Sequence, residues 1–149
     1  TVGTALVGLV AFYGLNELAY RLLGLVLDGM TNLNDVAISA QVRDAPRSTA
    51  LIVVFLAPFV EEVLFRGYVF GNLRDHSRWA AYAASCLLFA LLHVWQFAVV
   101  EQNLQYFLLM LQYLVPGLVL AWTYERSGTL WSSVMLHAFV NAMAIGRFL

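Results

Sequence analysis

The stretch "APFVEEVLFRGYVFGNLR", residues 57–74, places three charged side chains inside an otherwise apolar run. They are Glu61, Glu62 and Arg66. On insertion scales, each such charge costs roughly 2.5–3.5 kcal/mol at the centre of a lipid bilayer. A sequence that keeps three of them together therefore uses them to neutralise one another, to do chemistry, or both.

The composition of the whole chain is that of a membrane protein. Of its 149 residues, 62% are hydrophobic and 11% are charged, whereas a soluble domain is about 25% charged. The mean hydropathy is +0.77. The net charge is −1 and the chain has no Lys, so we expect no basic patch and exclude nucleic acid as a partner. The single Cys86 rules out a disulfide framework, and the expected partner of most of the surface is the lipid bilayer.

Five segments are long and apolar enough to span a membrane, which takes about 20 residues each. They are residues 2–27, 49–73, 79–99, 103–124 and 130–148. The only long polar connection is 28–48, in which 35–44 is expected to form a short interfacial helix before Pro46. No internal repeat is visible, so we predict a single domain, 1–149: an all-α, polytopic membrane helix bundle of about five transmembrane helices with its active site inside the bundle.

The first residues carry no sign of a secretory signal peptide. No positively charged segment precedes an apolar core with a small-residue cleavage site. The chain begins with Thr1. We therefore leave open whether a further segment precedes it.

Two pairs of opposite charges share one spacing. Glu17 and Arg21 lie four residues apart with Glu first, which is the favoured order for an ion pair on one helix face. Glu62 and Arg66 repeat that order and spacing. Because charges within a span must pair and face the bundle interior or a wet cavity, we predict two structural ion pairs inside the bundle.

Glu61 is left without a partner on its own helix. Successive residues are about 100° apart around a helix, so Arg66 cannot easily satisfy both Glu61 and Glu62. The partners of Glu61 must then come from other helices. Pro58 lacks a main-chain N–H and frees the carbonyl of Val54, so we also expect a kink that admits water to this span.

The remaining polar groups within the spans suggest those partners. His137 and Asn141 are four residues apart, so the fifth span presents an imidazole and a carboxamide on one face. His93 closes "FALLH", with Phe89 one turn earlier as its expected packing neighbour. Two His, one Asn and an unpaired Glu on three spans favour a functional site over isolated links between helices.

A carboxylate beside imidazoles in an apolar pocket that admits water is suited to activating that water, and oriented donors can stabilise an oxyanion. Hydrolysis of a carbonyl substrate is therefore the first hypothesis. The chain has no H-E-x-x-H motif and no Asp within any span. A Ser133–His137 dyad is disfavoured, because both residues project from one helix and no G-x-S-x-G is present. A metal site built from Glu61, His93 and His137 stays open, since three ligands plus water is the usual catalytic zinc set.

Three short motifs carry a resemblance to a known family. "EEVLFR" (61–66), "FALLH" (89–93) and "HAFVN" (137–141) resemble, in this order, the E-E-x-x-x-R, F-x-x-x-H and H-x-x-x-N motifs of the CPBP family. That family comprises the type II CAAX prenyl endopeptidases and their bacterial relatives, including bacteriocin-processing and immunity-associated proteins. The resemblance covers residues 57–141, the motif-bearing core. Eukaryotic members have more spans, so the chain resembles a catalytic core or a compact form from a bacterial or archaeal cell membrane.

The resemblance implies a glutamate-dependent intramembrane endopeptidase that needs no metal cofactor. Carried over by position, Glu61 would be the base that activates water, and His93 would help to hold that water. His137 and Asn141 would form the oxyanion site. The implied substrate is a peptide or protein, lipidated and membrane-anchored ones included.

The resemblance also makes Glu62 and Arg66 the ion pair that fixes the second span. Two other kinds of protein remain open: a non-catalytic membrane protein that binds a peptide or confers immunity, and a small transporter with Glu61 as proton carrier. The second would be expected to show an inverted repeat, and the sequence shows none.

Overall fold

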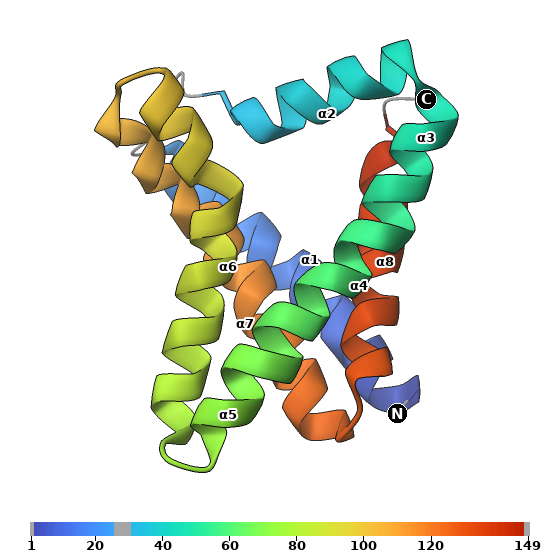
Figure 1. Ribbon diagram of the computed structural model, residues 1–149, viewed down its shortest axis with the longest axis vertical. Coiled ribbons are helices and arrows are strands. Elements are labelled where there is room, and N and C mark those ends of the chain that lie inside the picture. Colours follow the sequence, from blue (N-terminus) through green and yellow to red (C-terminus); the bar gives the residue numbers. More distant parts are fainter. Residues whose placement is uncertain (1, 26–30, 148–149) are drawn as a thin grey trace.

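The computed structural model describes residues 2–25 and 31–147, apart from the side chain of Gln105, and this part of the chain contains helices and no strands (Figure 1). In chain order the elements are α1 (Val2–Gly24), α2 (Leu33–Asp44), α3 (Pro46–Ala50), η1 (Leu51–Leu56), α4 (Ala57–Glu62), η2 (Val63–Phe70), α5 (Gly71–Arg74), α6 (Arg78–Val100), η3 (Leu104–Leu109), α7 (Met110–Ser127) and α8 (Leu130–Ile145). The predicted all-α fold class is confirmed.

Four helical runs in the described chain are long and apolar enough to cross a membrane. They are Val2–Gly24, Pro46–Arg74, Arg78–Val100 and Tyr106–Ser127. The fifth predicted span, 130–148, is an apolar helix of 16 residues, α8. At 1.5 Å per residue it is roughly 24 Å long, which is less than the roughly 30 Å of a bilayer's hydrocarbon core. The polytopic bundle is thus confirmed with four full-length spans and one shorter helix; residues 26–27 and 148 of the predicted spans lie outside the described residues.

The second span is not one regular α-helix. Its segments η1 and η2 are π-helical and flank α4, whose first turn contains Pro58. At the end of η1 the N–H of Ala57 donates to the carbonyl of Ile52, five residues back. In that register Pro58 leaves the carbonyl of Val53 without a main-chain donor. The expectation named Val54 because it assumed α-helical spacing, and for that carbonyl it stays a prediction.

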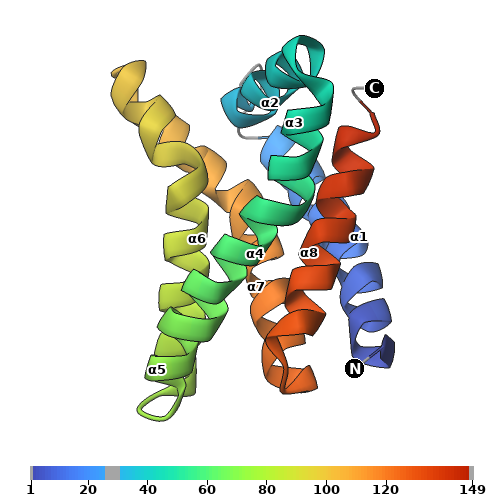
Figure 2. The ribbon, with the colours of Figure 1, turned by 45° about the vertical axis from the view of Figure 1, so that its right-hand side comes forward.

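The second span runs obliquely across the bundle, so that its two halves meet different helices (Figures 1 and 2). Segments η1 and α4 pack against α8, whereas η2 and α5 pack against α6. Both α6 and α1 pack against α7. Helix α1 can approach closely because a Cβ on Gly8 would lie 2.6 Å from Thr123 Oγ1. The main apolar core lies between these helices and consists of Phe12, Phe65, Phe89, Val119, Leu120 and Leu136.

Helix α1 carries the first predicted ion pair on its outer face. Arg21 Nε donates to Glu17 Oε1 at 2.7 Å, so the pair is confirmed. The side chains of Arg21 and Glu17 are 76% and 61% exposed, however, so the expectation that they face the bundle interior was wrong. The buried residues of α1 are Gly8 and Phe12. Glu17 lies five residues beyond Phe12, about 140° further round the helix, and therefore points away from the bundle.

Helix α2 confirms the helix predicted at 35–44 and runs across one end of the bundle (Figure 1). It begins after Asn32, whose side chain contacts Gln112 and Tyr113 of α7. It ends next to α3, where the hydroxyl of Thr49 donates to the carbonyl of Gln41 at 3.0 Å. This helix therefore connects the fourth span to the second at one end of the molecule.

Candidate active site

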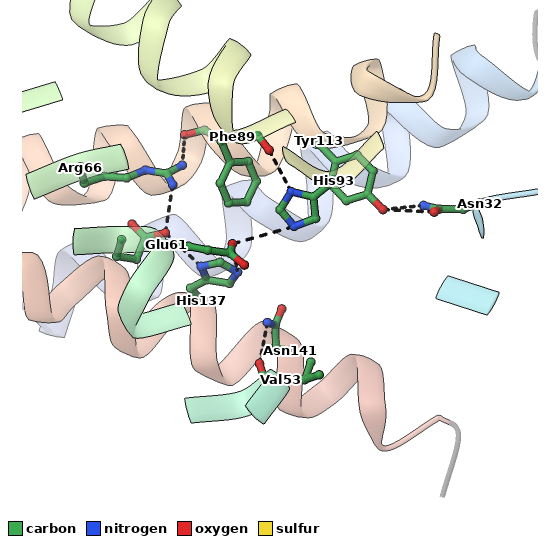
Figure 3. A network of polar contacts seen from close by, with 11 residues as sticks. Asn32, Val53, Glu61, Arg66, Phe89, His93, Tyr113, His137 and Asn141 are labelled. Atoms are coloured by element: carbon green, nitrogen blue, oxygen red, sulfur yellow. Dashed lines mark hydrogen bonds and ion pairs between the residues drawn. The ribbon is translucent and has the colours of Figure 1, made fainter. Parts of the chain in front are cut away.

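Three of the predicted site residues converge from three different elements. Glu61 on α4 faces His93 on α6 and His137 on α8 (Figure 3). Glu61 Oε2 lies 3.9 Å from the Nε2 atoms of both imidazoles. The side chains of Glu61 and His93 are 17% and 16% exposed, so the carboxylate is mostly but not completely enclosed. The partners of Glu61 are thus two of the residues that the sequence indicated.

Glu62, the neighbour of Glu61, bonds to other groups through Oε1, whereas its Oε2 is buried without a hydrogen-bond partner among the described residues. Arg66 Nη1 donates to Glu62 Oε1 at 3.0 Å, and both side chains are completely buried. The same oxygen lies 2.9 Å from Nδ1 of His137. The predicted ion pair has formed, and Glu62 also bonds to His137, which the sequence analysis had considered as a partner of Glu61, as a metal ligand and, from the resemblance, as part of the oxyanion site.

Arg66 is held by the second, third and fourth spans together. Its Nη2 donates to the carbonyl of Gly117 on α7 at 2.8 Å. Its guanidinium lies 4.6 Å from the centre of the Phe89 ring, within range of a cation–π interaction. A Cβ on Gly117 would be only 3.3 Å from Cys86 Cα, so the glycine lets α7 come close to α6 at this level. A buried guanidinium with a carboxylate, a carbonyl and an aromatic face as partners is compatible with an apolar interior.

The orientation of His93 follows from its other ring nitrogen. Its Nδ1 lies 2.8 Å from the carbonyl of Phe89, the residue predicted as its neighbour, and the two ring centres are 4.6 Å apart. A carbonyl can only accept a hydrogen bond, so Nδ1 carries the proton. In a neutral imidazole the other nitrogen, Nε2, is then an acceptor. That acceptor faces Glu61.

The same reasoning applies to His137. Glu62 is its partner at Nδ1, and a carboxylate accepts, so Nδ1 carries a proton and Nε2 is directed at Glu61. The hydroxyl of Ser133, one turn earlier on α8, donates to the carbonyl of Leu130 at 2.9 Å. This arrangement agrees with the sequence argument against a Ser–His dyad.

Asn141 contacts the backbone of the second span. Its Nδ2 donates to the carbonyl of Val53 at 2.9 Å (Figure 3). This is the carbonyl that Pro58 deprives of a main-chain donor in the π-helical register. The bond uses one N–H of the carboxamide and leaves a second N–H and the oxygen for other partners. The sequence placed Asn141 on the face of His137 but gave no sign of this bond.

The distances around Glu61 also bear on the metal hypothesis. Ligands of a catalytic zinc ion lie about 2.0–2.2 Å from the metal. Within residues 2–25 and 31–147, no group of three or more His, Cys, Asp or Glu side chains is arranged to hold a metal ion. Glu61 Oε2 lies 3.9 Å from Nε2 of His93 and from Nε2 of His137, and these three side chains do not form such a group. We therefore derive no step through a metal and leave its contribution to a chelation experiment.

One residue beside the site was not singled out from the sequence. The ring of Tyr113 on α7 stacks on that of His93, with centres 4.4 Å apart and planes 24° apart. Tyr113 belongs to none of the three motifs. An aromatic residue in an apolar span is usually part of the core, and only the fold shows which ring it meets.

Comparison with known proteins gives one family and two relatives. A family model described as "Type II CAAX prenyl endopeptidase Rce1-like" matches residues 44–143. UPF0177 protein YxdF of Lactococcus lactis subsp. lactis (strain IL1403) is 30% identical over 90 residues, which are 60% of this chain and 44% of the relative. UPF0177 protein YbdI of the same strain is 30% identical over 98 residues, 64% of this chain and 46% of the relative. The match thus covers a little less than half of each relative. No solved structure matches the chain significantly.

Proposed function

The chain belongs to the type II CAAX prenyl endopeptidase Rce1-like family, and from that premise we propose that it is an intramembrane endopeptidase in which Glu61 activates a water molecule. The family is the one that the three motifs resembled, and the matched range includes all three. Family membership indicates a membrane hydrolase of the CAAX-protease type. The catalytic roles of individual residues, and the substrate, are our proposal.

The attacking water is assigned to the space between Glu61 and His93. Oε2 and Nε2 are 3.9 Å apart, which is too long for a hydrogen bond. A water about 2.8 Å from each atom would bridge them. Both atoms accept, so the water would donate one proton to each and direct a lone pair at the substrate carbonyl carbon. As the C–O bond forms, Glu61 takes the proton that lies on its side.

The oxyanion that forms on the substrate carbonyl needs donors. His137 already uses one proton on Glu62, so its Nε2 can donate only when the imidazole carries both protons. The carboxylate of Glu62 would stabilise that positive charge. We assign the second donor to the N–H of Asn141 that is not used on Val53. In this scheme Glu62 acts on the reaction through His137 as well as on the fold through Arg66.

Collapse of the tetrahedral intermediate completes the reaction. The C–N bond breaks and the amide nitrogen leaves with its electron pair. Glu61 returns to that nitrogen the proton it took from water, so that a free carboxyl terminus and an amine are formed and the carboxylate is regenerated. Because the site lies within an apolar bundle, the substrate class is a polypeptide that is membrane-anchored or lipidated near the cleaved bond.

One observation carries this proposal more than the others. Glu61 Oε2 is buried and accepts no hydrogen bond from the described residues, while two imidazole nitrogens face it. Oε2 of Glu62 is also buried without a hydrogen-bond partner in the described chain, but the two partners of Glu62, Arg66 and His137, bond to its Oε1. What distinguishes Glu61 is that two imidazole Nε2 atoms face its unbonded oxygen. An oxygen that is enclosed, uncommitted and flanked by two oriented imidazoles is what a general base requires.

The experiment compares protein termini in membranes of the native host expressing the wild-type chain with those from cells expressing Glu61→Gln at equal abundance. The proposal predicts at least one new terminus that is present with the wild type and absent with the variant. Identical sets of termini would contradict it and would favour the non-catalytic peptide-binding alternative. Repeating the wild-type incubation on isolated membranes with a chelator tests the metal variant, which requires the terminus to disappear.

A further inference from the structure

Tyr113 forms one wall of the His93 site, although it belongs to none of the motifs. The imidazole lies between two aromatic rings, with the Tyr113 centre at 4.4 Å and the Phe89 centre at 4.6 Å. The Tyr113 ring is nearly parallel to the imidazole, at 24°, whereas the Phe89 ring is inclined at 46°. The ring plane of His93 is therefore set mainly by contact with Tyr113.

The hydrogen bond of His93 alone does not fix that plane. The bond from Nδ1 to the carbonyl of Phe89 holds one atom of the ring, about which the rest can still tilt. A tilt would move Nε2 relative to Glu61 Oε2, the pair of atoms between which we placed the attacking water. The stacked Tyr113 ring opposes that movement.

Tyr113 is in turn held by a residue far away in the sequence. Its hydroxyl lies 2.9 Å from Nδ2 and 3.1 Å from Oδ1 of Asn32, which is 81 positions earlier (Figure 3). Nδ2 of Asn32 also donates to Oε1 of Gln112 at 3.0 Å. The Tyr113 side chain therefore cannot rotate away without breaking the hydrogen bonds that join Asn32 to α7.

Asn32 is also the residue that begins α2. Its Oδ1 accepts from the N–H groups of Asn34 at 3.1 Å and Asp35 at 3.4 Å, which makes it the N-cap of that helix. Helix α2 crosses one end of the bundle and ends at the second span, where Val42 is buried and Thr49 bonds to Gln41 (Figures 1 and 2). One side chain therefore joins the start of α2 to the aromatic wall of the site.

We propose that Tyr113 is a positioning residue that fixes the ring plane of His93, and that Asn32 couples this position to the docking of α2 on the bundle. The consequence for catalysis rests on the function proposed above, in which His93 holds the attacking water. The positioning itself does not rest on it. Movement of α2 away from the bundle would release Tyr113 and loosen His93.

A purely structural role for Tyr113 is the competing explanation. Tyr113 and Tyr106 both pack against the same small cluster, Val94 and Leu109. Tyr106→Leu is therefore the matched control, because it removes a ring from that cluster while leaving the Tyr113–His93 stack in place. Tyr113→Phe keeps the stacked ring and removes only the bond to Asn32. Asn32→Ser keeps a cap for α2 but is too short to reach Tyr113.

The first test needs no substrate. In the 149-residue chain labelled with 15N-histidine, the side-chain nitrogen signals of His93, assigned by their loss in His93→Gln, report its hydrogen bonds and ring mobility. We expect Tyr113→Leu to shift or broaden these signals, Tyr113→Phe and Asn32→Ser to do so less, and Tyr106→Leu to leave them unchanged. His93 signals in Tyr113→Leu that match those of the Tyr106→Leu control would overturn the proposal.

The second test uses the substrate found by comparing termini. We expect Tyr113→Leu to lower kcat about 10- to 100-fold, with KM nearly unchanged, because a catalytic group would be misplaced rather than lost. Tyr113→Phe and Asn32→Ser should each lower kcat about 3- to 10-fold, the equivalent of one hydrogen bond. The double variant should lower kcat no further than either single variant, because both substitutions break the same bond.

Additive losses in the double variant, or a Tyr113→Leu kcat no lower than that of Tyr106→Leu, would overturn the proposal. A wild-type chain without Glu61-dependent cleavage would instead contradict the proposed function, and the nitrogen signals would still decide the positioning.

Discussion

Two ion pairs in this chain have the same spacing in the sequence, but one is exposed and the other is buried. Glu17–Arg21 and Glu62–Arg66 are each spaced four residues apart with Glu first, and each forms the expected ion pair. The first pair is 61% and 76% exposed on the outer face of α1, and the second is completely buried. Spacing alone therefore predicts that each ion pair forms. How the neighbouring helices pack decides whether the pair is buried and whether other residues bond to it.

The buried pair, Glu62–Arg66, also contacts residues on other helices. Glu62 Oε1 also bonds to His137, and Arg66 reaches Gly117 and Phe89. The Glu17–Arg21 bond involves only its two members. Glu62 is tied to Arg66 and His137 through Oε1, whereas Oε2 of the adjacent Glu61 accepts no hydrogen bond from the described residues and faces two imidazoles. The comparison suggests four experiments, and in the first of them Glu17 on α1 supplies the control for Glu61 on α4.

The largest effect is expected from Glu61→Gln. Loss of a general base lowers turnover by about 10²–10⁴-fold, measured as a single-turnover rate on the substrate found from new termini. Glu17→Gln is the matched control, since it makes the same chemical change on the outer face, and it should cleave at the wild-type rate. Glu61→Gln cleavage within a few-fold of the wild-type rate would contradict the role of Glu61.

A large loss of stability is expected from Glu62→Gln. It leaves the Arg66 guanidinium buried without a counter-charge, which typically costs about 3–5 kcal/mol. The double variant Glu62→Gln/Arg66→Met should recover part of this loss, because it removes the stranded charge as well. Thermal unfolding in detergent, followed by Trp fluorescence, measures both. A double variant that is less stable than Glu62→Gln would contradict this account of the pair.

A smaller effect is expected where Asn141 compensates for Pro58. Asn141→Leu strands the carbonyl of Val53 and should cost about 1–2 kcal/mol of unfolding free energy. In a Pro58→Ala background the new N–H can serve that carbonyl, so the same substitution should cost less. Asn72→Leu is the control, because Asn72 donates to the carbonyl of Tyr68 on an exposed face of the same span. Equal costs of Asn141→Leu in both backgrounds would refute the compensation.

The smallest effect is expected from Glu17→Gln. An exposed ion pair of this spacing contributes little, and we expect the unfolding midpoint to change by no more than about 2 °C. A fall in the midpoint as large as that caused by Glu62→Gln would contradict this expectation. The Glu17–Arg21 pair would then contribute as much to stability as Glu62–Arg66, which would require a partner on the outer face of α1.

The sequence predicted much of this arrangement because the determinants are local. Runs of apolar residues predict the helices, and helical spacing separates Glu61 from the Glu62–Arg66 pair. The outward direction of Glu17 could not be predicted, because it depends on which side of α1 meets α7. The loss of a main-chain donor at the carbonyl of Val53 could not be predicted either, since it follows from π-helical turns that have no distinct composition.

Contacts between distant residues were the least predictable part of the site. The motifs contain Glu61, His93 and His137, and the expectation that these meet is confirmed by the geometry. The bond of His137 to Glu62 and the stack of Tyr113 on His93 arise from how α7 and α8 pack. Asn32 lies in a polar connection that gives no sign of a bond across 81 positions.

The central claim is that the two adjacent glutamates have different roles: Glu62 is needed for the fold through Arg66 and also supports His137, whereas Glu61 is the catalytic base and is not needed for the fold. The most direct test compares the thermal unfolding midpoints of Glu61→Gln, Glu62→Gln and the wild type under one condition. We predict that Glu62→Gln falls by about 6 °C or more. Glu61→Gln should stay near the wild-type midpoint or exceed it, because a neutral amide replaces a buried carboxylate that lacks a hydrogen-bonded partner at Oε2. A midpoint for Glu61→Gln as low as that for Glu62→Gln would contradict the claim, because Glu61 would then be needed for the fold itself.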